Sequence, residues 1–345
     1  MKEEALAIPF KPNWLLRFFS WVNKLPIPAW MFYLLILFAG GASQHLFAWG
    51  KGVLEVGQFN IFLALSWIWL IEQLYYFGHV NPQIARQTLD EIRPQMDLDD
   101  EGFKSLSYEF MMTPASPPLI LPILGFLFGL LFAETVRPIS PEVNYTFPEF
   151  LFFIWGLTHA MTFVSCYAII RQLRVVNTVI AKKIRVDIYN LHSLYGLSRL
   201  TASMGIAILV IAFLTSFILV PQHIESTLHI IFYLSFLLLA LAVFVLPLTE
   251  INRRLREEKN RLVKRVNTEM KDAFEKVRND VKSNKIEQIQ SQSISIDIML
   301  KEKTLLESIP TWPWAPSTFR GFLAAVFLPL FLWFVQQLLG RLMGF

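Results

Sequence analysis

The fold of this chain is decided where an apolar stretch runs directly into a charged one. Residues 226–249 read STLHIIFYLSFLLLALAVFVLPLT and contain no charged side chain, whereas residues 250–281 read EINRRLREEKNRLVKRVNTEMKDAFEKVRNDV. A helix of roughly 20 apolar residues crosses the ~30 Å hydrocarbon core of a bilayer. We therefore predict a transmembrane helix that leaves the membrane near residue 249 and continues as a helix through water, with a kink at Pro247.

Six further stretches of the chain also lack charged residues. Hydrophobic residues make up 54% of the 345 residues and charged residues only 17%, whereas soluble domains carry about 25% charged residues. This composition excludes disordered and disulfide-rich secreted proteins. It predicts an all-α polytopic membrane protein with about seven transmembrane helices, the second and third being marginal in length. The predicted spans are residues 30–50, 56–77, 118–134, 149–170, 201–221, 227–249 and 319–341.

The segments between the spans complete the predicted organisation. The three parts are a membrane bundle (1–249), a cytoplasmic helical stalk (250–309), and an interfacial turn rich in Trp and Pro with the last span (310–345). Within the bundle we expect an interfacial helix at 13–24 and cytoplasmic segments at 78–116 and 171–199. Trp14 and Trp21 are typical of a helix that lies on the membrane surface.

The positive charges divide unevenly between the two faces that these spans define. Of the 31 Lys and Arg residues, only Lys51, Arg137 and Arg341 fall on one face. Cytoplasmic loops carry the excess of Lys and Arg in membrane proteins. We therefore expect a cytoplasmic N-terminus, an external C-terminus and a location in the plasma membrane.

Two spans continue beyond the membrane with helical periodicity. The fourth is predicted to extend as one helix to about Ile188, because apolar residues recur there at spacings of three and four. Beyond the sixth span, a narrow apolar stripe is flanked by charged residues, which is typical of a seam for one or two partner helices. The stripe consists of Leu255, Leu262, Val266, Val277 and Val281. We expect it to pack on the fourth-span extension. A homo-oligomeric stalk and a solvated single helix are the alternatives, and the far half, around Val277 and Val281, needs a second chain or another partner.

Residues 293–300 change in character. Ile294, Ile296 and Ile298 alternate with polar residues or Met, the two-residue period of a β-strand. The sequence leaves open whether this segment is a strand, which would need a pairing partner.

Polar groups within the predicted spans supply the candidate site residues. His159, Thr162 and Cys166 share one face of the fourth span, and this polar seam predicts either hydrogen bonds between helices or an ion or proton path. Glu72, near the cytoplasmic end of the second span, is expected to form an interfacial ion pair with Arg171. Small residues mark close helix contacts, among them Gly40 with Gly41 and the GxxxG pair Gly125 and Gly129.

Electrostatics also connects the two cytoplasmic segments of the bundle. Residues 78–116 carry an excess of acids, and residues 171–185 carry bases and no acid. We expect the two to attract each other, more weakly in high salt.

The sequence contains no strong catalytic motif. There is no phosphate-binding glycine loop, no His-Glu-x-x-His and no Gly-x-Ser-x-Gly. Asp97, Asp99, Glu101 and Gly102 match the first half of an EF-hand calcium loop, but Tyr108 stands where that loop needs a bidentate Glu. We therefore expect no metal and no cofactor, and interpret this segment as an acidic turn.

Three classes of function remain, and one leads. The leading hypothesis is non-catalytic signalling or assembly through the cytoplasmic helices, because these are the largest part of the chain outside lipid. The alternatives are an ion or small-solute channel or transporter that uses the seam around His159, and a membrane enzyme. The expected partners are the lipid bilayer and either a homo-oligomer or a cytoplasmic protein that binds the stalk, with no nucleic acid.

Overall fold

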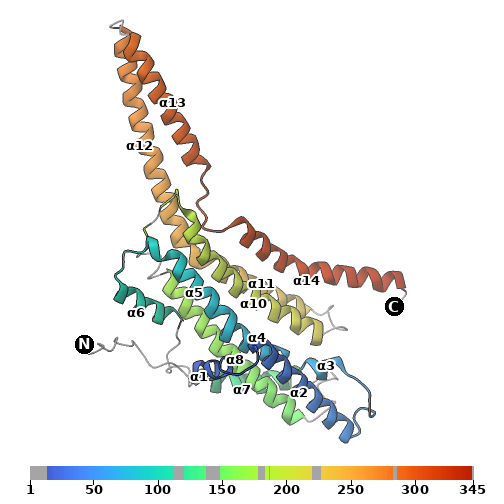
Figure 1. The fold of residues 1–345 in the computed structure, drawn as a ribbon. Helices are drawn as coiled ribbons and strands as arrows, with labels where there is room; N and C mark the ends of the chain where they lie inside the picture. Colours follow the sequence, from blue (N-terminus) through green and yellow to red (C-terminus); the bar gives the residue numbers. More distant parts are fainter. Residues whose placement is uncertain are drawn as a thin grey trace, which may run out of the picture.

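The computed structural model describes residues 14–111, 120–136, 148–177, 183–185, 187–219, 227–282 and 286–343. These residues form helices joined by turns and loops (Figure 1). Their one β-type feature is an isolated antiparallel bridge between Met96 and Ile184. The all-helical prediction is confirmed. The ends of the predicted third and fifth spans and parts of the segments 78–116 and 171–199 lie outside the described residues.

The helices follow one another along the chain. Their bounds are α1 Trp14–Val22, α2 Ala29–Gly50, α3 Ile61–Leu65, α4 Ile68–Tyr75, α5 Asn81–Ile92, α6 Asp100–Met111, α7 Ile120–Val136, α8 Pro148–Val175, α10 Tyr195–Leu219, α11 Thr227–Val245, α12 Thr249–Lys282, α13 Ile286–Ser308 and α14 Pro316–Met343. A π-helical turn, Tyr76–Val80, joins α4 to α5, and a 3-10 turn, Leu246–Leu248, joins α11 to α12. The second turn contains Pro247, where the sequence predicts a kink.

Four helical segments within the described residues are long and apolar enough to cross a membrane, which is fewer than the seven predicted. They are Ala29–Gly50, Phe152–Val175, Leu191–Leu214 and Leu234–Lys282, and shorter apolar helices occur at Ile120–Leu131 and Pro316–Leu328. The predicted second span differs most. It is divided into α3 and α4, because the chain turns at Ser66 and Trp67, and the hydroxyl of Ser66 donates to the Leu63 carbonyl oxygen at 2.9 Å.

The bundle is held together by helices from both halves of the chain. The α5 and α10 helices pack closely, and the Thr88 hydroxyl donates to the Gly196 carbonyl oxygen at 3.0 Å. Arg199 of α10 forms an ion pair with Glu91 of α5 at 3.1 Å. One large apolar core continues from these helices to the base of α12 and to Phe322 of α14. The base of α12 is thereby fixed to the bundle.

The predicted helical extension of the fourth span is wrong. The α8 helix ends at Val175, and at Ile184 the chain is extended and paired with Met96. The Arg185 amide donates to the Gln95 carbonyl oxygen at 2.7 Å, and the side chain of Ile184 is buried. Branched residues at spacings of three and four suit a helix, but they also suit extended backbone against an apolar core.

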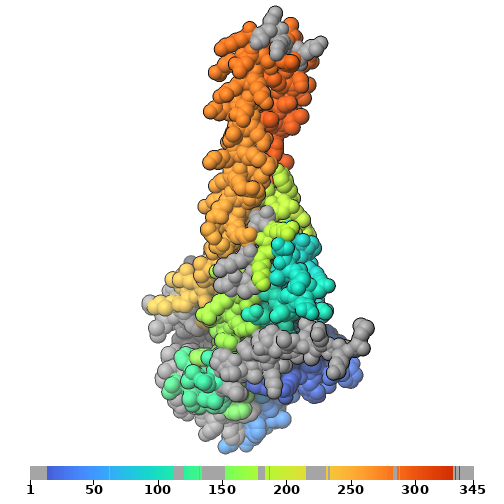
Figure 2. Space-filling view, turned by 90° about the vertical axis from the view of Figure 1, so that its left-hand side faces the viewer, coloured from blue at the N-terminus to red at the C-terminus, as the bar shows by residue number. Residues whose placement is uncertain are grey.

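The α12 and α13 helices form an antiparallel hairpin that projects from one end of the bundle (Figures 1 and 2). Residues 293–300 lie within α13, so the strand alternative is wrong. The alternating isoleucines divide between two helix faces. Ile296 is buried on α12, and Ile294 and Ile298 are exposed.

The predicted close contacts at glycine are confirmed. A Cβ added at Gly125 would lie 2.5 Å from the His159 carbonyl oxygen, and one at Gly129 would lie 2.7 Å from that of Trp155. Gly40 and Gly41 lie equally close to α3 and the turn after it, where a Cβ would meet Trp67 and Ala64. Glycine lets these helix backbones approach each other, which is how helices pack in lipid.

Candidate functional site

The inner face of the α12–α13 hairpin is closed by an apolar seam. Leu255, Leu262 and Val266 of α12 are buried, as are Ile296 and Leu306 of α13. On α13 the inward positions recur at alternating intervals of three and four residues, which is the heptad spacing of a two-helix coiled coil. The buried part of the stripe predicted on α12 therefore lies in the seam with α13, within one apolar core that also contains Val176, Ile184 and Ile188 of the predicted fourth-span extension.

The seam opens toward the tip of the hairpin. Val277 is half-buried and Val281 is 58% exposed. Near the tip the two helices are joined by a polar contact, in which the Gln292 amide donates to Asp280 at 2.8 Å. Of the predicted contact stripe, three residues are thus buried within this chain, and Val281 is not.

The base of the hairpin is fixed by hydrogen bonds to the end of α13. The Lys259 ammonium donates to the carbonyl oxygens of Glu307 and Ile309 at 2.7 and 2.8 Å. The side-chain amide of Asn252, itself buried, donates to the Thr311 carbonyl oxygen at 3.0 Å. A positive charge on the last carbonyl groups of a helix also favours the helix dipole. The hairpin is therefore a fixed arm rather than a loose tail.

The outward face of α12 is covered by charged side chains that pair along the helix. Arg253 contacts Glu250 at 2.6 Å and Glu257 at 2.9 Å, and Arg261 contacts Glu258 at 2.6 Å. The hydrogen bond to Glu250 and the attraction of the neighbouring carboxylates raise the pKa of Arg253 above its ordinary value. Such solvent-exposed pairs contribute little to stability, but they keep this face soluble.

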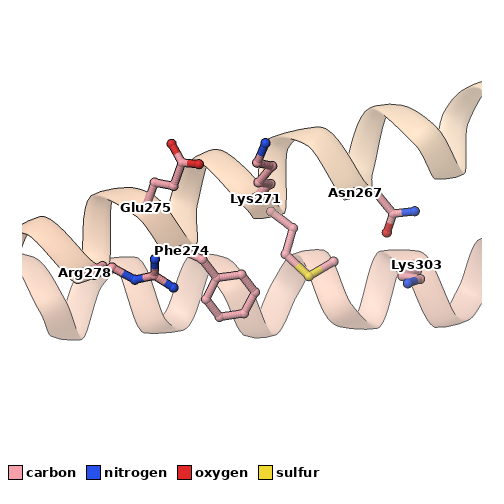
Figure 3. A pocket seen from close by; sticks show the side chains of 7 residues that line it. Asn267, Lys271, Phe274, Glu275, Arg278 and Lys303 are labelled. Atoms are coloured by element: carbon pink, nitrogen blue, oxygen red, sulfur yellow. The ribbon is translucent and has the colours of Figure 1, made fainter.

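A shallow groove lies along one flank of the hairpin near its middle (Figure 3). It has a volume of about 420 Å³ and includes Met270 and Phe274 of α12 and Lys303 of α13. Polar or charged residues, among them Lys271, Glu275 and Arg278, line the rest. Charges of both signs around one exposed aromatic ring give the groove no clear preference for a ligand.

The outer face of α13 is different, because it exposes large apolar side chains to solvent. Ile294 and Ile298 are each 59% exposed, and Leu305 is 54% exposed. A helix that is apolar on one side only would bury them, so α13 has two apolar faces. Sequence reasoning missed this outer face because it took the alternating isoleucines for a possible strand.

The polar side chains of the seam in the fourth span form hydrogen bonds with backbone carbonyl groups of their own helix, α8. The Thr162 hydroxyl donates to the Thr158 carbonyl oxygen, and the His159 Nδ1 lies 2.9 Å from the Trp155 carbonyl oxygen. His159 faces α7, where its ring lies 5.6 Å from that of Phe128, and Cys166 is exposed. Polar side chains in membrane helices commonly bond the carbonyl four residues earlier. Neither the groove on the hairpin nor the small cavity described below includes these residues.

Glu72 and Arg171 have different surroundings. The guanidinium of Arg171 donates to the Glu109 carbonyl oxygen at 2.6 Å, whereas Glu72 Oε2 is buried and has no hydrogen bond to any residue that the structure describes. The ion pair predicted between them is not among the contacts that the described residues show. We predicted an electrostatic attraction between residues 78–116 and residues 171–185. An ion pair between these segments is present at Arg185 and Asp97, whose side chains lie 3.1 Å apart.

A cavity of about 50 Å³ lies where α1 covers α5, α6 and α8. Asn81 Nδ2 and Ser165 Oγ are buried near it without a hydrogen bond among the residues described. A polar cavity of this size holds a few water molecules. Sequence reasoning did not single out Asn81, which follows the π-helical turn.

The acidic turn lies at the start of α6 and caps it. The Asp99 carboxylate accepts from the Gly102 amide at 2.9 Å, as an N-cap does, and Asp100 pairs with Arg93. Asp97 pairs with Arg185. Within the described part of the chain no group of three or more His, Cys, Asp or Glu could hold a metal ion. These contacts support the interpretation as an acidic turn.

Comparison with known protein families, with curated proteins and with solved structures finds nothing that matches this chain. The functional argument therefore rests on the geometry of the chain itself.

Proposed function

We propose that this chain is a seven-span membrane protein of the plasma membrane whose α12–α13 hairpin is a cytoplasmic arm for protein assembly or signalling. In this proposal the N-terminus is cytoplasmic, the C-terminus is external, and the activity is not catalytic. Four helices already suffice in length and composition to cross a membrane. The apolar helices α7 and α14 and the α3–α4 segment supply the remaining three spans.

The observation that carries this function is the apolar outer face of α13. Exposed large apolar residues are expected where lipid surrounds a helix, but this hairpin is flanked by charged residues that need water. An apolar stripe that the protein exposes to water marks a contact with another protein. The inner seam and the base of the hairpin support the same conclusion, because they hold the arm in one shape before any partner binds.

Transport through the polar seam has less support. The Thr162 hydroxyl and the His159 Nδ1 already have partners within α8. An ion path needs polar groups that face water or the ion. The two cavities described above lie elsewhere.

Photocrosslinking in native membranes tests the assembly function. A photoreactive amino acid at Ile294 or Ile298 of the full chain should give a covalent adduct with a protein, of whatever identity. The matched control places the same group at Lys264, which is exposed on the outer face of α12. If Ile294 and Ile298 crosslink no protein, or no more than Lys264 does, the hairpin is not an assembly arm.

Labelling of single cysteines tests the topology. In a Cys166→Ser background, an impermeant reagent applied to intact cells should label Glu55→Cys and leave Glu101→Cys unlabelled. Both positions are exposed in the folded chain. The opposite pattern would reverse the orientation, and labelling of both would remove α3 and α4 from the membrane.

A further inference from the structure

A row of buried polar groups lies between α4 and α8. The rings of Trp69 and Trp155 meet edge to face, with centroids 6.3 Å apart, so this face of α4 is directed toward α8. Gln73 lies one turn further along the same face. Its side chain is 1% exposed, and neither polar atom of its amide group has a hydrogen-bond partner among the residues described. A buried amide without a partner is costly unless water reaches it, so we expect water along this interface.

The cavity beneath α1 continues this row toward the predicted cytoplasmic side. Asn81 of α5 and Ser165 of α8 line it, and their side chains are 7% and 5% exposed. Asn81 Nδ2 and Ser165 Oγ have no hydrogen bond to any residue that the structure describes. The cavity also reaches Arg171 and Gln172, at the cytoplasmic end of the predicted fourth span. It can therefore bring cytoplasmic water to Asn81.

The Tyr76 hydroxyl connects this cavity to Glu72. The Asn81 side chain lies beside the hydroxyl without the geometry of a hydrogen bond, and Glu72 is close enough to act on it electrostatically. The Tyr76 hydroxyl also lies 3.0 Å from Ser203 Oγ of α10. A phenolic hydroxyl both donates and accepts, so it can give up its own hydrogen while it takes another. Tyr76 begins a π-helical turn, and such turns are frequent at functional sites.

The charged groups around α4 leave Glu72 without an ion pair among the residues described. The guanidinium groups of the packed helices α8 and α10 have other partners, since Arg171 donates to the Glu109 carbonyl oxygen and Arg199 pairs with Glu91. The imidazoles on α2, the π-helical turn and α8 also lie against other groups: His45 bonds to Asn60, His79 to Tyr33 and His159 to Trp155. The other ionisable side chains on these elements are Cys166, Tyr167, Arg174 and Tyr195. A carboxylate within a span is costly when no cation balances it, and a proton removes the charge.

We propose that Glu72 is a proton-binding site, which cytoplasmic protons reach through the cavity beneath α1 by way of Asn81 and the Tyr76 hydroxyl. A hydronium ion in the cavity gives one proton to the Tyr76 oxygen and becomes water. The hydroxyl passes its own hydrogen to Glu72 Oε2, so the phenol is restored and the carboxylate becomes a neutral carboxyl group. This inference goes beyond the proposed function and does not depend on the α12–α13 hairpin.

The chemistry of the surroundings favours a proton over a metal cation. The amide nitrogens of Asn81 and Gln73 donate hydrogen bonds, which suits water and a carboxyl group, whereas a metal cation needs several oxygen ligands. Within the described part of the chain Glu72 belongs to no group of three or more His, Cys, Asp or Glu that could hold a metal ion.

Infrared difference spectroscopy of the full chain in proteoliposomes tests the site. On acidification from about pH 10 to about pH 5, the wild type should gain the carbonyl stretch of a protonated carboxyl group in apolar surroundings. Glu72→Gln should lose this band, and its amide bands should remain those of the wild type. The matched control is Glu55→Gln, at an exposed position in the loop after α2, which should keep the band.

The rate at which the band appears after a rapid pH jump tests the path. Asn81→Leu should slow it by about 10-fold, because the path loses one hydrogen-bonding group. Ser165→Ala, a smaller change in the same cavity, should also slow it. The control is Ser235→Ala in α11, whose hydroxyl donates to the Ile231 carbonyl oxygen of its own helix, and which should leave the rate unchanged.

A further measurement needs no substitution. Dicyclohexylcarbodiimide modifies protonated carboxyl groups in apolar surroundings, so peptide masses of the treated wild-type chain should show an adduct at Glu72. The adduct should form faster at about pH 6 than at about pH 9, because only the protonated carboxyl group reacts.

Each result decides one part of the proposal. A band that survives in Glu72→Gln, or a wild-type chain without an adduct at Glu72, overturns the proton site. A band that depends on Glu72 but appears equally fast in Asn81→Leu and Ser165→Ala overturns the path. Loss of the band when sodium is added at constant pH would show a site for a metal cation and overturn the proton as its ligand.

Discussion

The α7–α8 pair and the α12–α13 pair are both antiparallel neighbours in sequence, but they pack by different means. The first is joined through Gly125 and Gly129, which lie against the backbone of α8. The second is joined through branched apolar residues such as Leu262 and Val266, flanked by charges. In lipid, apolar surface gains nothing by leaving the solvent, so close backbone contact holds helices together. In water, burial of apolar surface does so. The two pairs therefore pack by the two means that lipid and water favour.

The largest effect is expected from substitutions that break the glycine contact between α7 and α8. Gly125→Ile with Gly129→Ile should destabilise the bundle by about 4 kcal/mol, because each added side chain overlaps backbone that cannot move aside. The free energy of unfolding in mixed micelles measures this loss. The matched control is Gly321→Ile in α14, where an added Cβ meets nothing within 4 Å. Equal effects at the two sites would show that α7 and α8 are not held by close contact.

The second largest effect is expected from a substitution in the apolar seam between α12 and α13. Leu262→Ala should destabilise the hairpin by about 3 kcal/mol, since it leaves a cavity between α12 and α13. Hydrogen exchange of the α12 amides measures the loss. Val281→Ala is the control and should change stability by less than about 0.5 kcal/mol, because this side chain is already exposed. If the two substitutions have the same effect, the seam is not what closes the hairpin.

A smaller effect concerns the polar seam of α8. His159→Leu should cost about 1 kcal/mol or less, because the imidazole bonds within its own helix and membrane hydrogen bonds are weak. His159→Gln should cost less still. Unfolding in the same micelles as for the glycine variants allows direct comparison. A cost as large as that of the glycine pair would show that the imidazole joins α7 to α8.

Much of this architecture could be predicted from the sequence, and the failures share one physical cause. Uncharged runs and glycine spacing are properties of one helix and can be recognised from its residues alone. The helices α2 and α8 and the Gly125–Gly129 contact could therefore be predicted. The partner of a helix depends on the rest of the chain. The α12 stripe was identified, but α13 was not identified as its partner, because a helix with two apolar faces has the same alternation as a strand. The prediction for the segment around Ile184 failed for the same reason, since its bridge to Met96 depends on residues far away in sequence.

The smallest expected effect concerns His79, which lies beneath α1. His79 follows the second predicted span and lies among aromatic rings: Phe19 at 5.9 Å, Tyr33 at 5.4 Å and Tyr75 at 5.7 Å between centroids. Its Nε2 also lies 3.2 Å from the Tyr33 hydroxyl. Burial lowers the pKa of His79 below its ordinary value, because the charged imidazolium is poorly solvated there.

A lowered pKa in the folded chain fixes the direction of the pH dependence. The unfolded chain takes up the proton first, so stability is complete above the ordinary His pKa of about 6.5 and falls as the pH drops through and below it. His79 is only partly buried, so the change should be smaller than that caused by His159→Leu. The melting temperature in micelles between pH 8 and pH 5 measures it, and His79→Gln should remove this component. His192→Gln, at an exposed histidine, should leave it in place. If both variants retain the full pH dependence, another group titrates, and α1 does not cover His79 in the membrane.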